Sequence, residues 1–268
     1  LAGGWTDTPP QCFFAGGKVL NLAAEINGQP PLQCFIKRCQ RPALIIRSID
    51  LGCEEQIEHY EQLRQYTAVG SAFSIPKAAL ALCGFLPDFH ASPPPTLSDL
   101  LKSLGGGLEL TMLSALPKGS GLGTSSILAA TILGALNEVC GLGWTNQEII
   151  RRTSVLEQLL TTGGGWQDQA GGIIPAVKLL ETRAGLFQAP QPSWLPERMF
   201  VEHANHDMLL YYTGITRVAK DILHEVVRGM FLNDGQELAI LAEMGAHAQA
   251  LARQIQRGNW NAVGLGVR

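Results

Sequence analysis

Several features that mark particular classes of protein are missing from this sequence. It has no cluster of Lys and Arg that could follow a phosphate backbone, and its net charge is −3, so nucleic acid is not an expected partner. No uninterrupted apolar run has the length of a membrane span, and the N-terminus lacks a basic region followed by an apolar core. These absences predict a protein that is neither embedded in a membrane nor secreted.

Signatures of zinc binding and of hydrolase chemistry are also missing. The six cysteines are scattered and form neither a Cys-x-x-Cys pair nor a Cys/His cluster, which fits a reduced, cytoplasmic compartment. The six histidines have no ligand spacing, and no Ser-His-Asp arrangement is evident. A hydrophobic content of 46% allows a sizeable core in one or two domains, and the nearly balanced charge favours a small-molecule substrate.

What the sequence does contain is a glycine-rich loop with hydroxyl side chains at residues 117–126. Its glycines let backbone N–H groups approach an anion, and a helix that follows would add the positive end of its dipole. A flexible turn without a ligand is the alternative interpretation. The residues predicted to hold phosphate are Pro117, Gly119, Ser120, Gly121, Leu122, Gly123, Thr124, Ser125 and Ser126.

This loop lies between a predicted strand and a predicted helix. Residues 108–113 alternate apolar and polar side chains, as a half-buried strand does. Residues 124–140 repeat apolar side chains at the spacing of one buried helical face, and the pattern stops at Gly141. The loop is not a Walker A loop, because no Gly-Lys-Ser/Thr closes it, and it matches the Gly-x-Gly-x-x-Gly of dinucleotide folds only loosely.

The rest of the chain mixes strands and helices without regular β-α-β alternation, which predicts an α+β fold. Three short runs, residues 18–26, 32–37 and 43–49, predict one small antiparallel sheet. Further strands are predicted at residues 173–180 and 208–213, and helical patterns at residues 60–85, 145–160, 217–231 and 234–256. Residues 257–268 show no clear pattern.

Residues 117–126 resemble the Pro-x-x-x-Gly-Leu-Gly-Ser-Ser-Ala motif of the GHMP kinases, the superfamily of galactokinase, homoserine kinase and mevalonate kinase. Thr124, Ser125 and Ser126 stand where the motif has Ser-Ser-Ala, which keeps the hydroxyls. Residues 3–10, 163–169 and 211–217 are similar to the branch that phosphorylates fucose and heptoses. The likeness covers nearly the whole chain.

This resemblance implies a two-lobed α+β fold. Residues 1–180 would form a ribosomal-S5-like N-terminal lobe with the phosphate-binding loop, and residues 181–268 part of a ferredoxin-like C-terminal lobe. The family pattern also implies a fragment truncated at both ends. A strand ending in a basic residue is expected before Leu1, and a third, glycine-rich motif beyond Arg268.

Helical periodicity places Glu157 at the edge of the buried face of residues 145–160. A buried carboxylate needs a positive partner, so either a metal ion or a neighbouring Arg is expected beside it. In GHMP kinases, a helix glutamate lies about eleven positions before the catalytic aspartate. The resemblance therefore implies that Ser125 and Glu157 bind Mg²⁺.

Asp168 follows three glycines and Trp166, where an aspartate is commonly a turn or helix-cap residue. Within the family's Gly-x-x-Asp-Gln pattern, it is implied to be the base that orients or deprotonates a sugar hydroxyl. Asp7 by itself suggests a Thr-Asp turn, whereas likeness to the Gly-Glu-His-Thr-Asp segment of galactokinase places it against sugar hydroxyls. The implied sugar-binding residues are Gly4, Trp5, Asp7, Gly165, Asp168 and Arg217.

Arg217 is equally compatible with a solvated position at the start of a helix. The function implied by the resemblance is ATP-dependent phosphorylation of L-fucose at its anomeric hydroxyl, giving L-fucose 1-phosphate and ADP, with ATP and Mg²⁺ as cofactors. A GHMP kinase for a heptose, arabinose or galactose is one alternative. A catalytically silent sugar- or nucleotide-binding module is another.

Overall fold

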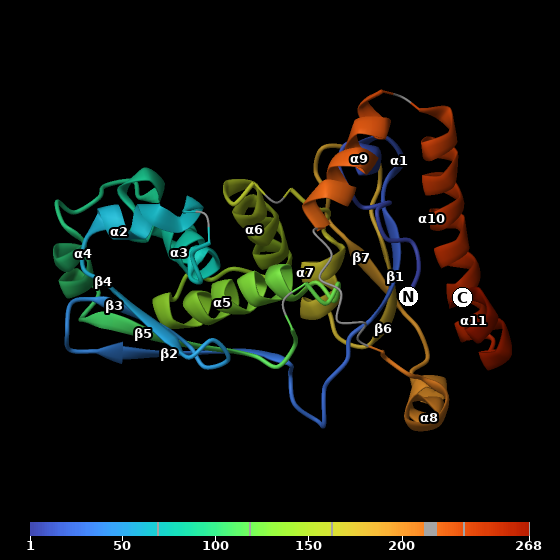
Figure 1. Cartoon of the computed structure of the whole chain (residues 1–268), viewed down its shortest axis with the longest axis horizontal. Coiled ribbons are helices and arrows are strands. Elements are labelled where there is room, and N and C mark those ends of the chain that lie inside the picture. The colour runs from blue at the N-terminus through green and yellow to red at the C-terminus, as the bar shows by residue number, and fades with distance from the viewer. Residues whose placement is uncertain (69, 118, 162, 212–218, 233, 268) are drawn as a thin grey trace. The chain divides into compact units, whose positions relative to one another are not determined.

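The computed structural model describes residues 1–68, 70–117, 119–161, 163–211, 219–232 and 234–267. These residues divide into two compact units, each with its own sheet (Figure 1). The β2–β5–β3–β4 unit comprises Glu25–Lys118 and Gly123–Gly163. The β1–β6–β7 unit comprises Leu1–Ala24, Gly119–Leu122 and Gly164–Arg268.

The β2–β5–β3–β4 unit is built on a mixed four-stranded sheet. Strand β5 (Gly107–Ser114) pairs antiparallel with β2 (Leu32–Cys39) and parallel with β3 (Leu44–Ser48), and β4 (Cys53–Ile57) pairs antiparallel with β3. Alternate β5 side chains, from Leu108 onwards, are buried, as expected for a strand that packs one face on a core. The prediction of a strand at residues 108–113 is confirmed.

Helices of this unit lie over one face of the sheet (Figure 1). Helix α5 (Thr124–Cys140) packs against β2, α3 (Ser74–Leu80) and α6 (Asn146–Leu159), and its buried face includes Leu133. The bounds of α5 and α6 confirm the helices predicted at residues 124–140 and 145–160. The helical pattern predicted at residues 60–85 is instead divided into short helices, because Ala68 and residues 70–73 are not helical. The remaining elements of the unit are α2 (Tyr60–Arg64), the 3-10 helix η1 (Gln65–Thr67), the π-helical turn η2 (Ala81–Phe85), the 3-10 helix η3 (Pro87–Phe89) and α4 (Leu97–Ser103).

The β1–β6–β7 unit has an antiparallel three-stranded sheet. Strand β6 (Val177–Glu181) lies between β1 (Lys18–Leu22) and β7 (Gln191–Trp194). Val177 and Leu179 belong to a hydrophobic core completed by apolar residues of the long helix α10. The helices of this unit are α1 (Gln11–Ala15), α7 (Gln167–Ile173), α8 (Arg198–Asp207), α9 (Ala219–Phe231), α10 (Gly235–Gln256) and α11 (Trp260–Val267).

Strand pairing corrects one prediction. Residues 18–26, 32–37 and 43–49 do not form one antiparallel sheet, because β1 pairs with β6 while β2 and β3 both flank β5. Period-2 alternation identifies a strand, but it carries no information about which strand becomes the hydrogen-bonded neighbour.

Two predicted strands near the C-terminal half also need correction. Residues 173–176 precede the strand, since Ile173 is the last residue of α7 and β6 begins at Val177. Residues 208–211 adopt no strand, and residues 212–213 lie outside the described residues. Periodicity at residues 257–268 was too weak to indicate α11.

The α+β prediction is confirmed by the two sheets and their covering helices. The division into lobes at residues 180 and 181 stays a prediction. The compact units themselves are discontinuous in sequence, because β1 and β6 pair across about 160 residues of chain. No helix among the described residues combines the length and apolar character that crossing a bilayer requires.

Candidate active site

The predicted phosphate loop has an unusual backbone. Gly119, Gly121 and Gly123 have φ angles of 72°, 76° and 67°, a left-handed region that residues with a Cβ rarely adopt. Gly123 is the N-cap of α5, and its carbonyl accepts the first helical hydrogen bond from Ile127. The first N–H groups of α5 therefore follow a residue that has no side chain to cap them, which suits an anion.

The residues of the predicted phosphate loop are divided between the two compact units. Gly119–Leu122 belongs to the β1–β6–β7 unit, whereas Gly123 and the α5 hydroxyl residues belong to the β2–β5–β3–β4 unit. Pro117, the first residue of the loop, is exposed. Thr124 and Ser125 are on the first turn of α5, and Ser126 is buried.

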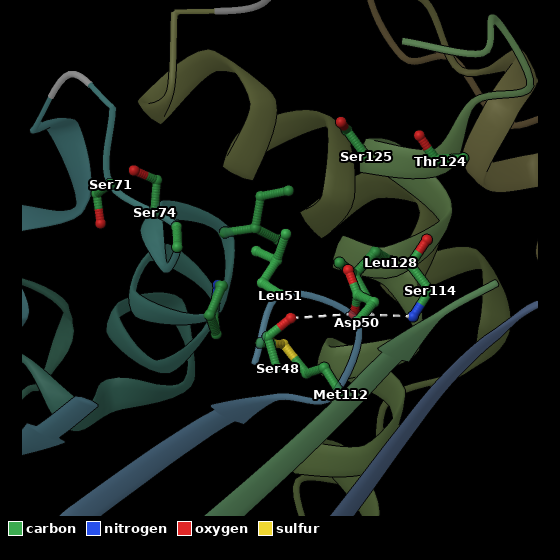
Figure 2. Close-up of a pocket in the computed structure, with 13 residues that line it drawn as sticks. Ser48, Asp50, Leu51, Ser71, Ser74, Met112, Ser114, Thr124, Ser125 and Leu128 are labelled. Carbon is green, nitrogen blue, oxygen red and sulfur yellow. Dashed lines mark hydrogen bonds between the residues drawn. The ribbon is translucent and has the colours of Figure 1, made fainter. Parts of the chain in front are cut away.

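A pocket of about 260 Å³ lies beside this first turn, within the β2–β5–β3–β4 unit. Figure 2 shows hydroxyl and carboxylate side chains from four segments around it. Asp50 is held in place there, because its Oδ1 accepts hydrogen bonds from the Ser48 hydroxyl (3.0 Å) and the Ser114 N–H (3.2 Å). The lining residues are Ser48, Asp50, Leu51, Ser71, Ala72, Ser74, Ile75, Pro76, Met112, Ser114, Thr124, Ser125 and Leu128.

Of this lining, the sequence indicated only Thr124 and Ser125. Ser48 ends β3, Ser74 begins α3, and neither belongs to a recognisable motif. Only the packing of α3 and α5 over the sheet brings these segments together. No pattern in the sequence could have indicated Ser48, Asp50, Ser71 or Ser74.

Glu157 of α6 is buried, with 8% of its surface exposed, as its helical position predicted. Its Oε1 accepts a short hydrogen bond from the hydroxyl of Ser126, which is itself buried on α5. Ser126 occupies the position where the family motif has alanine. The hydroxyl thus holds the carboxylate that was predicted to bind metal.

The donor chemistry around Glu157 fits magnesium. Mg²⁺ binds hard oxygen ligands and is commonly held by one or two carboxylates, with water and substrate phosphates completing its shell. Glu157 and the Ser125 hydroxyl are ligands of that kind. The described residues contain no group of three or more His, Cys, Asp or Glu that could enclose a metal by themselves. A site that relies on a phosphate ligand is consistent with this finding.

Asp7 and the segment around Asp168 come together in the β1–β6–β7 unit. Asp7 is fully buried, and its Oδ2 accepts a hydrogen bond of 2.8 Å from the N–H of Gln167, the first residue of α7. Gly165 packs directly on this carboxylate, since a Cβ at Gly165 would lie 2.0 Å from Asp7 Oδ2. Two motifs separated by about 160 residues are therefore in direct contact.

Burial changes the acidity of both carboxyl groups. Desolvation raises the pKa of Asp7 to about 7, opposed by the Gln167 N–H bond and reinforced by the charge of Asp168. Burial also raises the pKa of Asp168. Carboxyl groups with raised pKa values near one another are common at functional sites.

Gly4 lies next to the same contact. A Cβ at Gly4 would be 3.1 Å from Oε1 of Gln167. Trp5 has a φ of 71°, which is rare for a bulky side chain and costs backbone energy. Of the predicted sugar-binding residues, Gly4, Asp7 and Gly165 are thus gathered around the start of α7, which carries Asp168. Arg217 lies outside the described residues.

Residues 95–174 match the GHMP kinases N terminal domain family. The chain therefore shares this domain with the GHMP kinases. It is 55% identical, over 97% of its length, to a Bacteroides fragilis protein named L-fucokinase/L-fucose-1-P guanylyltransferase, and spans 28% of that protein. It is 32% identical, over 92% of its length, to a bifunctional fucokinase/GDP-fucose pyrophosphorylase of Arabidopsis thaliana, and spans 23% of it.

A solved structure shows the same fold. The D-glycero-D-manno-heptose 1-phosphate kinase from Bacteriodes thetaiotaomicron superposes with a TM-score of 0.65, covering 96% of this chain and 70% of that one, at 19% identity. The predictions of the GHMP kinase family and of its α+β fold are confirmed. The roles of individual site residues stay predictions.

Proposed function

We propose that this GHMP kinase chain transfers the γ-phosphoryl group of ATP to the anomeric hydroxyl of L-fucose, giving L-fucose 1-phosphate and ADP. The observation that carries the proposal is the 55% identity to the Bacteroides fragilis protein whose name includes L-fucokinase. The left-handed glycines of the loop before α5 support the proposal, because they would let backbone N–H groups approach the phosphates of a nucleotide. In this proposal the enzyme acts in sugar salvage in the cytoplasm, and its partners are ATP and the sugar.

The loop and α5 are proposed to bind the phosphates of ATP. Backbone N–H groups of residues 119–126 would face the phosphate oxygens, and the helix dipole would favour their negative charge. The pocket beside Thr124 and Ser125 is continuous with this first turn and is assigned to another part of the nucleotide. The hydroxyls of Ser48, Ser71 and Ser74 and the carboxylate of Asp50 are available there as polar partners.

Ser125 and Glu157 are proposed to hold Mg²⁺. When bound, the ion neutralises negative charge on the transferring phosphoryl group. Ser126 contributes through Glu157, because its hydroxyl donates to Oε1 and restricts the orientation of the carboxylate. The remaining ligands would come from ATP and water.

Asp168 is proposed to orient the acceptor hydroxyl and accept its proton. Phosphoryl transfer has a loose transition state, so an aligned acceptor matters more than a strong base. Its raised pKa moves the carboxyl towards the range in which a base is most effective. Gly4, Trp5, Asp7, Gly165 and Arg217 are assigned to sugar binding.

Release of ADP in the presence of ATP, Mg²⁺ and single monosaccharides tests this function. We expect L-fucose to give the highest kcat/KM in a panel with D-galactose, D-arabinose and D-glycero-D-manno-heptose, and ³¹P NMR to show an anomeric phosphate. A higher kcat/KM for another sugar would reassign the substrate within the family. ATP binding without turnover of any sugar would favour a silent binding module.

A further inference from the structure

The helix that carries Asp168 is a weak helix by itself. Helix α7 has seven residues, Gln167–Ile173, and two of them are glycines. Isolated helices of this length are unstable in water, and each interior glycine disfavours the helix further. The position of α7, and with it that of Asp168, must therefore depend on contacts with the rest of the β1–β6–β7 unit.

The N-terminal end of α7 is held by Asp7, through the hydrogen bond of 2.8 Å to the N–H of Gln167. A carboxylate at a helix N-terminus satisfies an N–H group that the helix leaves unpaired and interacts favourably with the dipole. This contact fixes one end only. A short helix can still pivot or unwind from its other end.

The C-terminal end of α7 is held by Lys178 of β6. Lys178 is fully buried, and its Nζ donates to the carbonyl of Gly171 (2.8 Å) and to that of Ala176 (3.2 Å). A positive charge at a helix C-terminus complements the dipole, and the ammonium satisfies carbonyls that the helix cannot.

Burying an ammonium group at this position costs desolvation free energy. No carboxylate among the described residues forms an ion pair with Lys178, and burial lowers its pKa to about 8. An apolar side chain of similar length would avoid the desolvation penalty. Packing alone therefore does not account for a lysine here, whereas donation to the end of α7 does.

A second contact places the same end of α7 on the sheet. Asn21 of β1 and Lys178 of β6 are paired directly across the strands. Gly171 packs on Asn21 so closely that a Cβ would lie 2.2 Å from Nδ2 of Asn21. Neighbouring side chains on two strands thus contact one turn of α7, one by hydrogen bonding and the other by packing.

We infer that Lys178 is a positioning residue, which fixes the C-terminal end of α7 on the β1–β6 strand pair so that Asp168 keeps its place at the other end. The inference rests on the proposed function, in which Asp168 acts on the sugar hydroxyl. Lys178 itself touches neither substrate nor nucleotide in this scheme. Its effect is expected on kcat, through the alignment of Asp168.

Substitution Lys178→Met, with Lys102→Met as control, tests the inference in the full-length protein. Lys102 lies exposed on α4 of the other unit. We expect kcat for the sugar to fall at least about tenfold, because small displacements of a catalytic group have large effects on rate. The KM for ATP should stay within about twofold. Hydrogen exchange should accelerate at the amides of residues 167–173, and Lys102→Met should change none of these quantities.

Gly171→Ala provides a second variant in case Lys178→Met does not fold. The added Cβ collides with Asn21 and should displace the same end of α7, whereas Gly134→Ala on α5 places its Cβ at 4.0 Å from the nearest atom, an ordinary contact. Gly171→Ala should lower kcat and accelerate exchange in α7, and Gly134→Ala should do neither.

Folded variants with unchanged exchange in α7 would overturn the inference, as would accelerated exchange with unchanged kcat. These results differ from failure of the proposed function. In that case the unsubstituted protein would phosphorylate no sugar in the panel, and hydrogen exchange in α7 would still decide whether Lys178 holds the helix.

Discussion

Two residues of the predicted site make contacts that the sequence did not indicate. Asp7 was predicted to face sugar hydroxyls, and it also caps α7 through Gln167. Ser126, which replaces an alanine of the family motif, holds the carboxylate of Glu157. Neither role follows from residue type, because both depend on a partner at least 31 positions away in the sequence.

Asp168→Asn is expected to lower kcat by roughly 10²- to 10⁴-fold, because the amide can neither accept the proton nor align the hydroxyl as a carboxylate does. ATP affinity should remain within a few-fold. Steady-state kinetics and calorimetry of ATP binding measure the two effects separately. A variant that retains more than about a tenth of the original kcat would remove Asp168 from the catalytic role.

Glu157→Gln is expected to raise the Mg²⁺ concentration needed for half-maximal activity and to lower kcat, because an amide is a poorer ligand for a hard cation. Glu138→Gln, an exposed position on α5, is the control. Activity titrated with Mg²⁺ and thermal melts give the two readouts. A loss of roughly 3–5 kcal/mol of stability without a shift in the Mg²⁺ curve would indicate pairing with a buried cation instead.

Asp7 should make stability depend on pH. Its pKa is raised from 3.8 to about 7, so between these values the folded protein holds a proton that the unfolded chain has released. The contribution of Asp7 to the free energy of unfolding therefore falls as pH rises from about 4 to about 7. Asp7→Asn should remove this slope. Melting temperatures of both proteins across this pH range should diverge in favour of the variant, and parallel curves would contradict the assignment.

At the scale of secondary structure, periodicity predicted the most regular helices and strands, but it did not predict which strands pair. The helices at α5 and α6 and the strand at β5 were predicted because their apolar spacing extends over whole elements. Helix α7 was not predicted, since two glycines leave no apolar repeat, and it forms because Asp7 and Lys178 hold its ends. The single sheet expected from residues 18–49 was wrong although its strands form, because β1 pairs with β6 and β2 pairs with β5.

Gly123→Val is expected to weaken ATP binding while sugar binding persists. A branched side chain disfavours a φ of 67° and obstructs the approach of phosphate to the backbone. Gly141→Val is the matched control, since Gly141 ends the same helix with a φ of 62° and open space around it. Both should lose stability, but only Gly123→Val should lose ATP affinity in calorimetry. Equal affinities would leave the loop as a simple turn.

At the scale of the whole molecule, binding should appear as stabilisation. ATP with Mg²⁺ at about 100 times its Kd should add roughly 2.7 kcal/mol to the free energy of unfolding, because only the folded state binds it. Without Mg²⁺, the increase in melting temperature should be smaller, and Glu157→Gln should reduce the difference. The same melting temperature with and without the nucleotide would contradict a nucleotide site.

The sequence by itself determined the periodic elements, the α+β class and the glycine loop before α5, because each depends on neighbours within a few residues. Tertiary structure decided which strands pair, which side chains line the pocket beside α5, and how α7 is held. These features join residues such as Asp7 and Gln167, which are 160 positions apart. Hydrogen bonds over such separations form only when the fold brings the two residues together, so no local pattern records them.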